Sequence, residues 1–293
     1  MKIFGKLKAE RWIMLFIVCL FALLVIFPFI ATLAGSFMSE AEISLRYSTS
    51  LSVFDIIEGL SQRFIQIALI PQEVTLAQYR AVLIDQPAFL LLMLNSARLT
   101  VPVVVLGVIV SLLAAYGFTI WSFRYKEAVF FIYIVVMLMP LVAVLVPNYI
   151  IAEQLGLIGS LWAIILPGIF SPFGTFLLRQ NMKSLPASYF EAAKIDGAGN
   201  LYILIYIVIP QVKSGIAALS MLVFIEYWNV VEQAVVFIRD YQAEPLSVFL
   251  SRIAQGRIGL IFAVSSVYMF FPLWFLLFGQ KDLEKGIELS GVK

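Results

Sequence analysis

Long stretches without a charged residue are the feature that most constrains what this chain can fold into. Five of them lack Asp, Glu, Lys and Arg altogether: residues 12–39, 99–123, 128–152, 154–178 and 258–280. A helix needs about 20 mostly apolar residues to cross a bilayer core. A sixth candidate, roughly 211–231, contains Lys213 near its start and Glu226 near its end. We therefore predict an all-α, polytopic membrane protein with six transmembrane helices.

Composition agrees with this class and excludes several others. Hydrophobic residues make up 62% of the chain and charged residues 13%, whereas a soluble protein has about 25% charged residues. A soluble enzyme, a disordered chain and a nucleic-acid binder are therefore excluded as leading interpretations. The sequence has no histidine and a single cysteine, Cys19. Histidine catalysis, histidine metal ligation and cysteine-rich metal or redox sites are excluded as well, so no metal site is predicted.

The distribution of lysine and arginine predicts the orientation in the membrane. Basic residues in short loops favour the cytoplasmic side. Of the 20 basic residues, 13 lie before the first span, between spans two and three, between spans four and five, or after span six. This predicts a cytoplasmic N-terminus (1–11), a first transmembrane helix (12–34) retained as an anchor, an extracytoplasmic loop (35–88) and a cytoplasmic tail (282–293). Prolines within the spans are consistent either with kinks for packing or with helices that bend between two states.

The segment 183–213, between spans four and five, has the most informative local pattern. Ser184 and Pro186 form a helix-start signal, and good helix formers follow from Ala187 to Asp196. Gly197 and Gly199 are expected to end that helix. A second apolar run, 201–209, precedes Pro210, where we expect the chain to turn into the membrane.

Small residues within this short helix allow two interpretations. Ala192 and Ala193 are flanked by Glu191, Lys194 and Asp196. Small side chains permit close backbone approach, and a carboxylate offers a directed, charge-assisted contact. The helix is therefore either a solvated cytoplasmic loop or a docking element for a cytoplasmic partner.

The spacing in this loop resembles the EAA motif of the permease subunits of ABC importers. The family pattern is EAA, three residues, Gly, nine residues, Ile, one residue, Leu-Pro. The matching residues here are Glu191, Ala192, Ala193, Gly197, Ile207, Ile209 in place of leucine, and Pro210. Asp196 and Ala198 around the glycine match the form common in carbohydrate importers.

Other short motifs extend the resemblance from about residue 88 to the end of the chain. They are Asn95-Ser96, Tyr116-Gly117-Phe118, Trp228-Asn229 and the last four residues, Ser290 to Lys293. The pattern is most similar to sugar-type permeases that resemble the second membrane subunit of the maltose importer. Two departures are a longer 35–88 loop and the sequence Leu283-Glu284-Lys285-Gly286 in the tail.

The resemblance implies a type I ABC importer permease fold, with a five-helix core over 89–281 and a coupling loop at 183–213. It implies a place in a bacterial cytoplasmic membrane beside a second, homologous permease subunit, two ABC ATPase subunits and an extracytoplasmic solute-binding protein. ATP and Mg would bind to the ATPase subunits, because this chain has no GxxxxGK[ST] phosphate loop. Glu191 would pair with a basic residue of the ATPase, and Gly197 would permit the turn that seats the helix. No cofactor is expected in this chain, and it is not expected to be an enzyme itself.

Polar residues within the membrane are candidates for a substrate path. They are Asn95, Arg98, Glu226, Trp228 and Asn229. In one interpretation Arg98 and Glu226 satisfy each other or other polar groups of the bundle. In the other, Glu226, Trp228 and Asn229 line the path, because aromatic faces stack on sugar rings while carboxylates and amides bind hydroxyls.

Three other functions remain as alternatives to a sugar importer. The first is an ABC permease for another solute, since the EAA pattern is shared among importers. The second is a self-contained secondary transporter or channel, which would need ionisable residues for ion coupling, and four of the six spans have none. The third is a membrane enzyme, for which the sequence offers no catalytic set.

Overall fold

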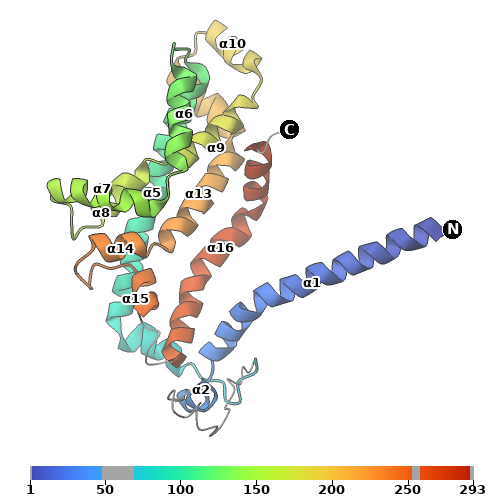
Figure 1. Ribbon diagram of the computed structural model, residues 1–293, viewed down its shortest axis with the longest axis vertical. Helices are drawn as coiled ribbons and strands as arrows, with labels where there is room; N and C mark the ends of the chain where they lie inside the picture. Colours follow the sequence, from blue (N-terminus) through green and yellow to red (C-terminus); the bar gives the residue numbers. More distant parts are fainter. Residues whose placement is uncertain (1, 48–68, 253–257, 291–293) are drawn as a thin grey trace. The chain divides into compact units, whose positions relative to one another are not determined.

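A computed structural model describes residues 2–47, 69–252 and 258–290, and the regular secondary structure of this part is helical, without a strand (Figure 1). Part of the predicted 35–88 loop lies outside the described residues, as do Met1 of the predicted N-terminal segment and the last three residues of the predicted tail.

Four helical stretches are long and apolar enough to cross a membrane. They are Arg11–Ser36, Ala88–Ile120, Trp162–Lys183 and Ile258–Gly286. Two bent pairs pass the same test, Lys126–Met137 with Leu141–Gln154 and Asn200–Gln211 with Lys213–Trp228. With each pair counted as one span, the described helices provide the six predicted spans.

The third and fourth spans differ from the charge-free stretches that predicted them. The stretch 128–152 is broken rather than straight, because its two helices meet at an angle of 101°. Pro140, at the break, has an extended backbone (φ −66°, ψ 142°) and no N–H to continue the first helix. The fourth span begins at Trp162 instead of residue 154, because Gly156 and Gly159 adopt positive φ and turn the chain first.

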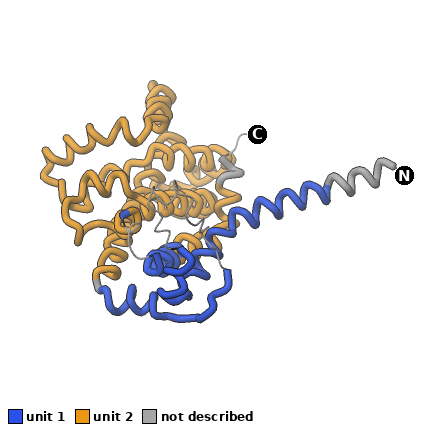
Figure 2. Tube along the Cα trace, turned by 60° about the horizontal axis from the view of Figure 1, so that its bottom comes forward, with its two compact units in different colours: residues 1–87, 252–269 blue, residues 88–251, 270–293 orange. Residues whose placement is uncertain are grey.

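The chain divides into two compact units (Figure 2). Unit 1 comprises Met1–Pro87 and Arg252–Met269, and unit 2 comprises Ala88–Ser251 and Phe270–Lys293. The last long helix, α16, contributes residues to both units.

Unit 1 shows that the described part of the predicted 35–88 loop is folded. Its elements are α1 (Lys2–Ser36), α2 (Glu40–Tyr47), α4 (Ala77–Arg80), η1 (Ala81–Asp85) and the start of α16 (Ile258–Ser290). Glu42 accepts hydrogen bonds from the backbone N–H of Gln72 at 3.1 Å and pairs with Arg46 at 3.1 Å. The ring of Phe262 packs against Gly35, where an added Cβ would come within 2.7 Å of it.

Unit 2 contains several long helices (Figure 1), and three of them contribute residues such as Leu112, Leu178 and Leu219 to one hydrophobic core. Its longer elements are α5 (Pro87–Ile120), α6 (Lys126–Met137), α9 (Pro172–Lys183), α13 (Lys213–Trp228) and the second half of α16. Both α6 and α13 pack on α9. Close approach of α16 to α13 depends on glycine, because a Cβ at Gly286 would lie 2.6 Å from the Ser214 carbonyl oxygen.

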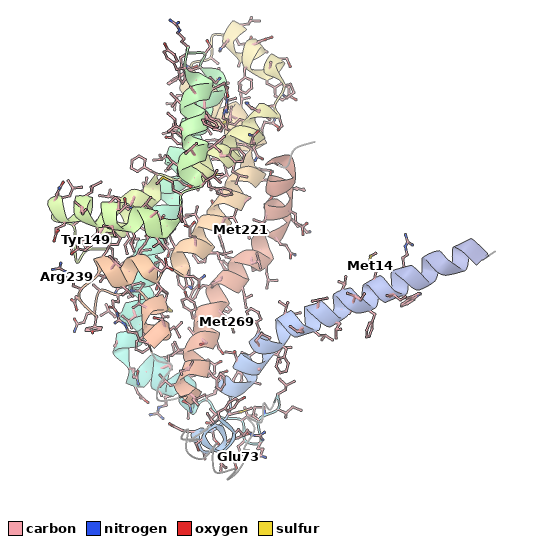
Figure 3. The ribbon with its side chains drawn as sticks, in the orientation of Figure 1. Met14, Glu73, Tyr149, Met221, Arg239 and Met269 are labelled. Carbon is pink, nitrogen blue, oxygen red and sulfur yellow. The ribbon has the colours of Figure 1, made fainter. Side chains whose placement is uncertain are left out.

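A second cluster in unit 2 joins the shorter helices. These are α7 (Leu141–Gln154), α8 (Trp162–Ile169), α14 (Glu232–Phe237) and α15 (Leu246–Arg252). Buried Ile164, Ala234 and Phe237 belong to this cluster. At its surface the Arg239 guanidinium donates to the Tyr149 hydroxyl at 2.9 Å, and Figure 3 labels both residues. The cluster therefore fixes the bent third span against the segment that follows α13.

Candidate functional site: the 183–213 loop and a neighbouring cavity

The predicted loop helix exists as α10 (Ala187–Ile195), with Pro186 as its N-cap residue. Its two faces have different roles. Ala193 is buried in the hydrophobic core, and Phe190 packs against the same core. Glu191 and Ala192 are exposed, and Ile195 is 86% exposed. The helix is thus anchored by one face and presents a carboxylate beside small and apolar side chains on the other.

The end of α10 explains why glycine stands at position 197. Gly197 has φ +78°, in the left-handed region. Its N–H donates to the Lys194 carbonyl at 3.1 Å, and the Ala198 N–H donates to the Ala193 carbonyl at 2.9 Å. This pair of bonds is the Schellman motif, which satisfies the last carbonyls of a helix. The predicted helix end at Asp196 and Gly197 is therefore confirmed.

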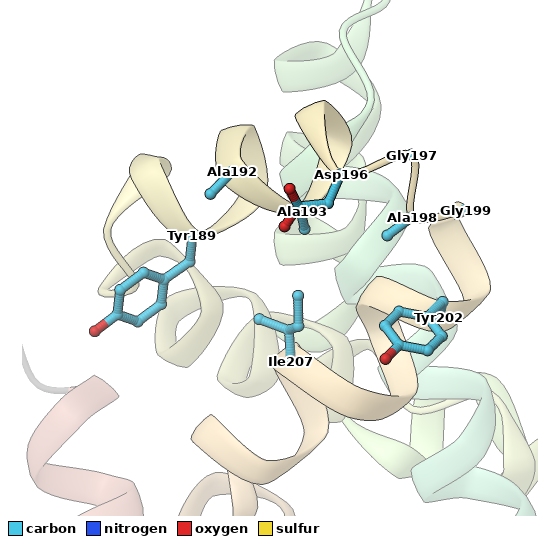
Figure 4. A pocket seen from close by; sticks show the side chains of 9 residues that line it. All are labelled: Tyr189, Ala192, Ala193, Asp196, Gly197, Ala198, Gly199, Tyr202 and Ile207. Carbon is cyan, nitrogen blue, oxygen red and sulfur yellow. The ribbon is translucent and has the colours of Figure 1, made fainter.

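A cavity of about 680 Å³ lies beside α10 and is lined by residues of this loop alone (Figure 4). Its lining residues are Tyr189, Ala192, Ala193, Asp196, Gly197, Ala198, Gly199, Tyr202 and Ile207. Four of the predicted coupling residues, Ala192, Ala193, Asp196 and Gly197, are among them. Glu191 is exposed but is not one of the lining residues.

The second half of the loop is a helix with a wide turn in its middle. It consists of α11 (Asn200–Tyr202), the π-helical segment η2 (Ile203–Val208) and α12 (Ile209–Gln211). This helix meets α13 at an angle of 79°. Pro210, which has no N–H to donate, lies two residues before the bend at Val212. The structure thus has a turn of the chain next to Pro210, as predicted, while the position of this turn at the membrane stays a prediction.

Long-range contacts hold both the 183–213 loop and α9, the helix that leads into it. The Tyr116 hydroxyl donates to the Asn200 carbonyl at 3.1 Å, which attaches α5 to the start of α11. Arg179 is 1% exposed; its Nη2 donates to Glu127 at 2.5 Å, and its Nε donates to the Phe118 carbonyl at 3.3 Å. Its guanidinium also lies 3.7 Å from the ring centroid of Phe130.

A second cavity, of about 690 Å³, lies in unit 2 where α13 ends. Glu226 and Tyr227 of α13 line it together with Asn148 of α7 and Gln233 of α14. A smaller adjoining cavity of about 320 Å³ shares Glu226, Tyr227 and Gln233 and adds Asn229 and Glu232. The structure therefore places two of the predicted path residues, Glu226 and Asn229, at one site.

Residues 89–277 match the family model described as the binding-protein-dependent transport system inner membrane component. That match covers well over half of the chain. The chain belongs to this family. It is therefore a transport permease and a multi-pass membrane protein.

Named relatives of this permease span most of its length. A polygalacturonan/rhamnogalacturonan transport system permease protein of Bacillus subtilis, YtcP, is 29% identical over 82% of this chain and 77% of its own. An arabinooligosaccharides transport system permease protein, AraQ of Halalkalibacterium halodurans, is 24% identical over 96% of both chains. A crystal structure of a bacterial ABC transporter that imports the acidic polysaccharide alginate shares the fold, with a TM-score of 0.75 and 24% identity over 94% of both chains.

The other predicted path residues of the permease have different surroundings. Asn95 is 4% exposed, and its amide donates to the carbonyls of Gln242 at 2.7 Å and Glu244 at 3.2 Å. These bonds hold the loop between α14 and α15. Arg98 is exposed and forms no ion pair with Glu226 within the described residues. A path role for Asn95 and Arg98 stays a prediction.

Trp228 and Asn229 of the permease, adjacent in sequence, differ in burial. Trp228 is 3% exposed and packs between the rings of Phe224, at 5.3 Å, and Phe271, at 5.4 Å. Asn229 is exposed, and its amide donates to the Ile225 carbonyl at 2.8 Å, near the end of α13. The geometry gives Trp228 a packing role in an aromatic cluster, and its path role stays a prediction.

Sequence reasoning missed several residues of these sites. Arg179 directly follows the charge-free stretch 154–178 and is one of the basic residues counted between spans four and five, yet it is buried within α9. Ile195 was missed as an exposed apolar side chain four residues after Glu191, a spacing that places both on one face of the helix. Asn148 gave no signal, because it lies far from Glu226 in sequence and meets it only through the bent third span. Gln233 follows Glu226 by seven residues but lies on a separate helix, α14, so no helical spacing relates the two.

Proposed function

We propose that this permease is one of two membrane subunits of an ATP-driven, binding-protein-dependent importer of a sugar or oligosaccharide in a bacterial cytoplasmic membrane. Two ABC ATPase subunits would bind ATP and Mg and would dock on α10, and an extracytoplasmic solute-binding protein would deliver the substrate. The observation that supports this most is α10 itself, a helix anchored by Ala193 with an exposed Glu191.

Charge and exposure favour a docking role for this helix over a solvated loop. Glu191 makes no ion pair within the described residues, so its carboxylate is available to a basic side chain of an ATPase. Ile195, Leu201 and Tyr202 add exposed apolar surface at 86%, 66% and 56% exposure. Exposed apolar side chains on a surface outside the membrane are typical of a protein interface.

Glu191 provides the direct test of this role. Glu191→Ala and the uncharged Glu191→Gln should leave expression and folding unchanged, because the side chain is exposed. Both should lower import relative to ATP hydrolysis in proteoliposomes that contain the whole complex. Glu153→Gln, an exposed carboxylate on α7, is the matched control. Normal import by both Glu191 variants would contradict the docking role.

Copurification tests the assembly itself. The tagged permease, extracted in mild detergent, should bring with it an ATPase and a second permease subunit. Recovery of the permease alone would favour a self-contained transporter instead. A thermal-shift screen of the cognate binding protein would then separate a sugar from another solute. Relatives named for other solutes include an osmoprotective compounds uptake permease protein of Synechocystis, GgtD, which is 29% identical over 68% of this chain.

A further inference from the structure

We propose that the cavity beside Glu226 receives the transported saccharide and selects uncharged or cationic sugars against uronates. This inference rests on the proposed function and adds the charge class of the substrate. The cavity has about 690 Å³, within the range of small-molecule sites.

The lining supplies groups suited to sugar hydroxyls and ring faces. Asn148 and Gln233 offer amide donors and acceptors, and Phe173 and Tyr227 offer aromatic surface. Tyr227 is held against the backbone of Gly168, where an added Cβ would lie 2.7 Å from the tyrosine hydroxyl oxygen. The aromatic wall of the cavity therefore depends on a glycine on the facing helix, α8.

The charge of the lining is negative only. Glu226 lines both adjoining cavities, and Glu232 lines the smaller one. None of the residues that line either cavity is a lysine or an arginine. Glu226 forms no ion pair within the described part of the chain, so its charge is not compensated by a neighbouring cation there.

An uncompensated carboxylate repels a second one in the same cavity. At about 5 Å and the dielectric constant of water, two unit charges of the same sign disfavour each other roughly fourfold, and a less polar setting increases the effect. A uronate therefore meets repulsion at Glu226, whereas a neutral sugar can donate a hydroxyl to the same carboxylate. An amino sugar gains an attraction of similar size. We therefore expect the substrate of this permease to differ in charge from that of its structural neighbour, which belongs to a transporter that imports the acidic polysaccharide alginate.

Charge-selective thiol labelling measures the potential in this cavity without knowledge of the sugar. In the assembled complex, Cys19→Ser removes the only thiol of the permease, and Gln233→Cys places a reporter on the wall that both cavities share. The same complex without Gln233→Cys gives the background from thiols of the other subunits. Cationic and anionic methanethiosulfonate reagents are compared, each relative to its rate with a free thiol. We expect the cationic reagent to be favoured about tenfold and the preference to fall several-fold on addition of Glu226→Gln. Glu153→Gln should leave it unchanged. An unchanged preference in Glu226→Gln, or a preference for the anionic reagent, would overturn the inference.

Uptake of a panel of saccharides provides a second test of the inference. The complex and its cognate binding protein are assayed for uptake of trimers of a neutral hexose, of glucosamine and of galacturonate. Uptake of a neutral or amino trimer in preference to galacturonate supports the inference. Uptake of galacturonate at an equal or higher rate overturns it and leaves the proposed importer intact. Failure to copurify an ATPase would contradict the proposed function. The same labelling, carried out on the permease as it is purified, would then still decide the sign of the cavity potential.

Discussion

Replacement of Gly197 by alanine should loosen the end of α10 without disturbing any packing contact. Gly197 has φ +78°, and a residue with a Cβ pays about 1–2 kcal/mol in that left-handed conformation. A Cβ added at Gly197 meets no atom within 4 Å, so no steric clash adds to this cost. We call the helix end closed when the Gly197 and Ala198 amides are bonded to the last turn of α10. A loss of 1–2 kcal/mol shifts the equilibrium from the closed to the open form by a factor of about 5–30.

Hydrogen exchange at the Ala198 amide is the direct measure of this loosening. That amide donates to the Ala193 carbonyl only when the helix end is closed. In Gly197→Ala we expect its exchange to be faster by about 5–30-fold. Gly197→Asn should be milder, because asparagine occupies the left-handed region more readily than alanine. In proteoliposomes with the whole complex, import per ATP hydrolysed should fall in the same order.

Gly199→Ser is the matched control. Gly199 also has open space around it, but its φ is −72°, and it is the N-cap of α11, where serine is a preferred residue. It should show wild-type exchange and wild-type coupling. If Gly197→Ala exchanged like the wild type, the argument from backbone strain would be refuted. If exchange were faster while import per ATP stayed normal, the coupling role of this helix end would be refuted instead.

Two further predictions concern buried polar contacts. Glu127→Ala should lower the melting temperature in detergent more than Arg179→Met does. Although the Glu127 side chain is 70% exposed, its removal leaves the buried Arg179 guanidinium without its carboxylate partner. Arg179→Met, by contrast, leaves a carboxylate in water and loses a cation–π contact of about 1 kcal/mol; the reverse order of melting temperatures would contradict this. Asn95→Ala should cost about 1–3 kcal/mol and speed proteolysis between α14 and α15, because the Gln242 and Glu244 carbonyls lose their donor. Unchanged protease sensitivity there would show that the amide does not hold the loop.

Local chemistry made the end of α10 predictable from sequence. Gly197 follows a run of helix formers, and the left-handed C-cap glycine is a rule that depends on neighbouring residues alone. The bend near Pro210 is similar, since a missing N–H acts within one turn. The third span was predictable only as an apolar stretch. A charge-free run cannot show that Pro140 ends one helix and starts another at 101°.

The burial of Arg179 and the partners of Asn95 could not be predicted from sequence, because both depend on tertiary contacts. Arg179 was counted among loop charges, yet Glu127, Phe118 and Phe130, all far away in sequence, create the site that buries it. The Asn95 amide binds carbonyls about 150 positions later in the chain. A polar residue in a span signals that it needs partners. It does not show whether those partners are protein backbone or substrate.

The helix α13 connects the two sites and suggests how the 183–213 loop could act on the cavity. It begins at Lys213, directly after the bend, and ends at Trp228, beside Glu226 and Tyr227 of the cavity wall. Its 16 residues span about 24 Å at 1.5 Å per residue. An α-helix packed along its length transmits a displacement as a rigid body, because each backbone group is bonded within the element. A shift of α10 that moves the 79° bend would therefore move Glu226 relative to Asn148 and Gln233, which lie on other helices. Such a motion would alter the cavity wall from the 183–213 loop without an ionisable relay across the membrane.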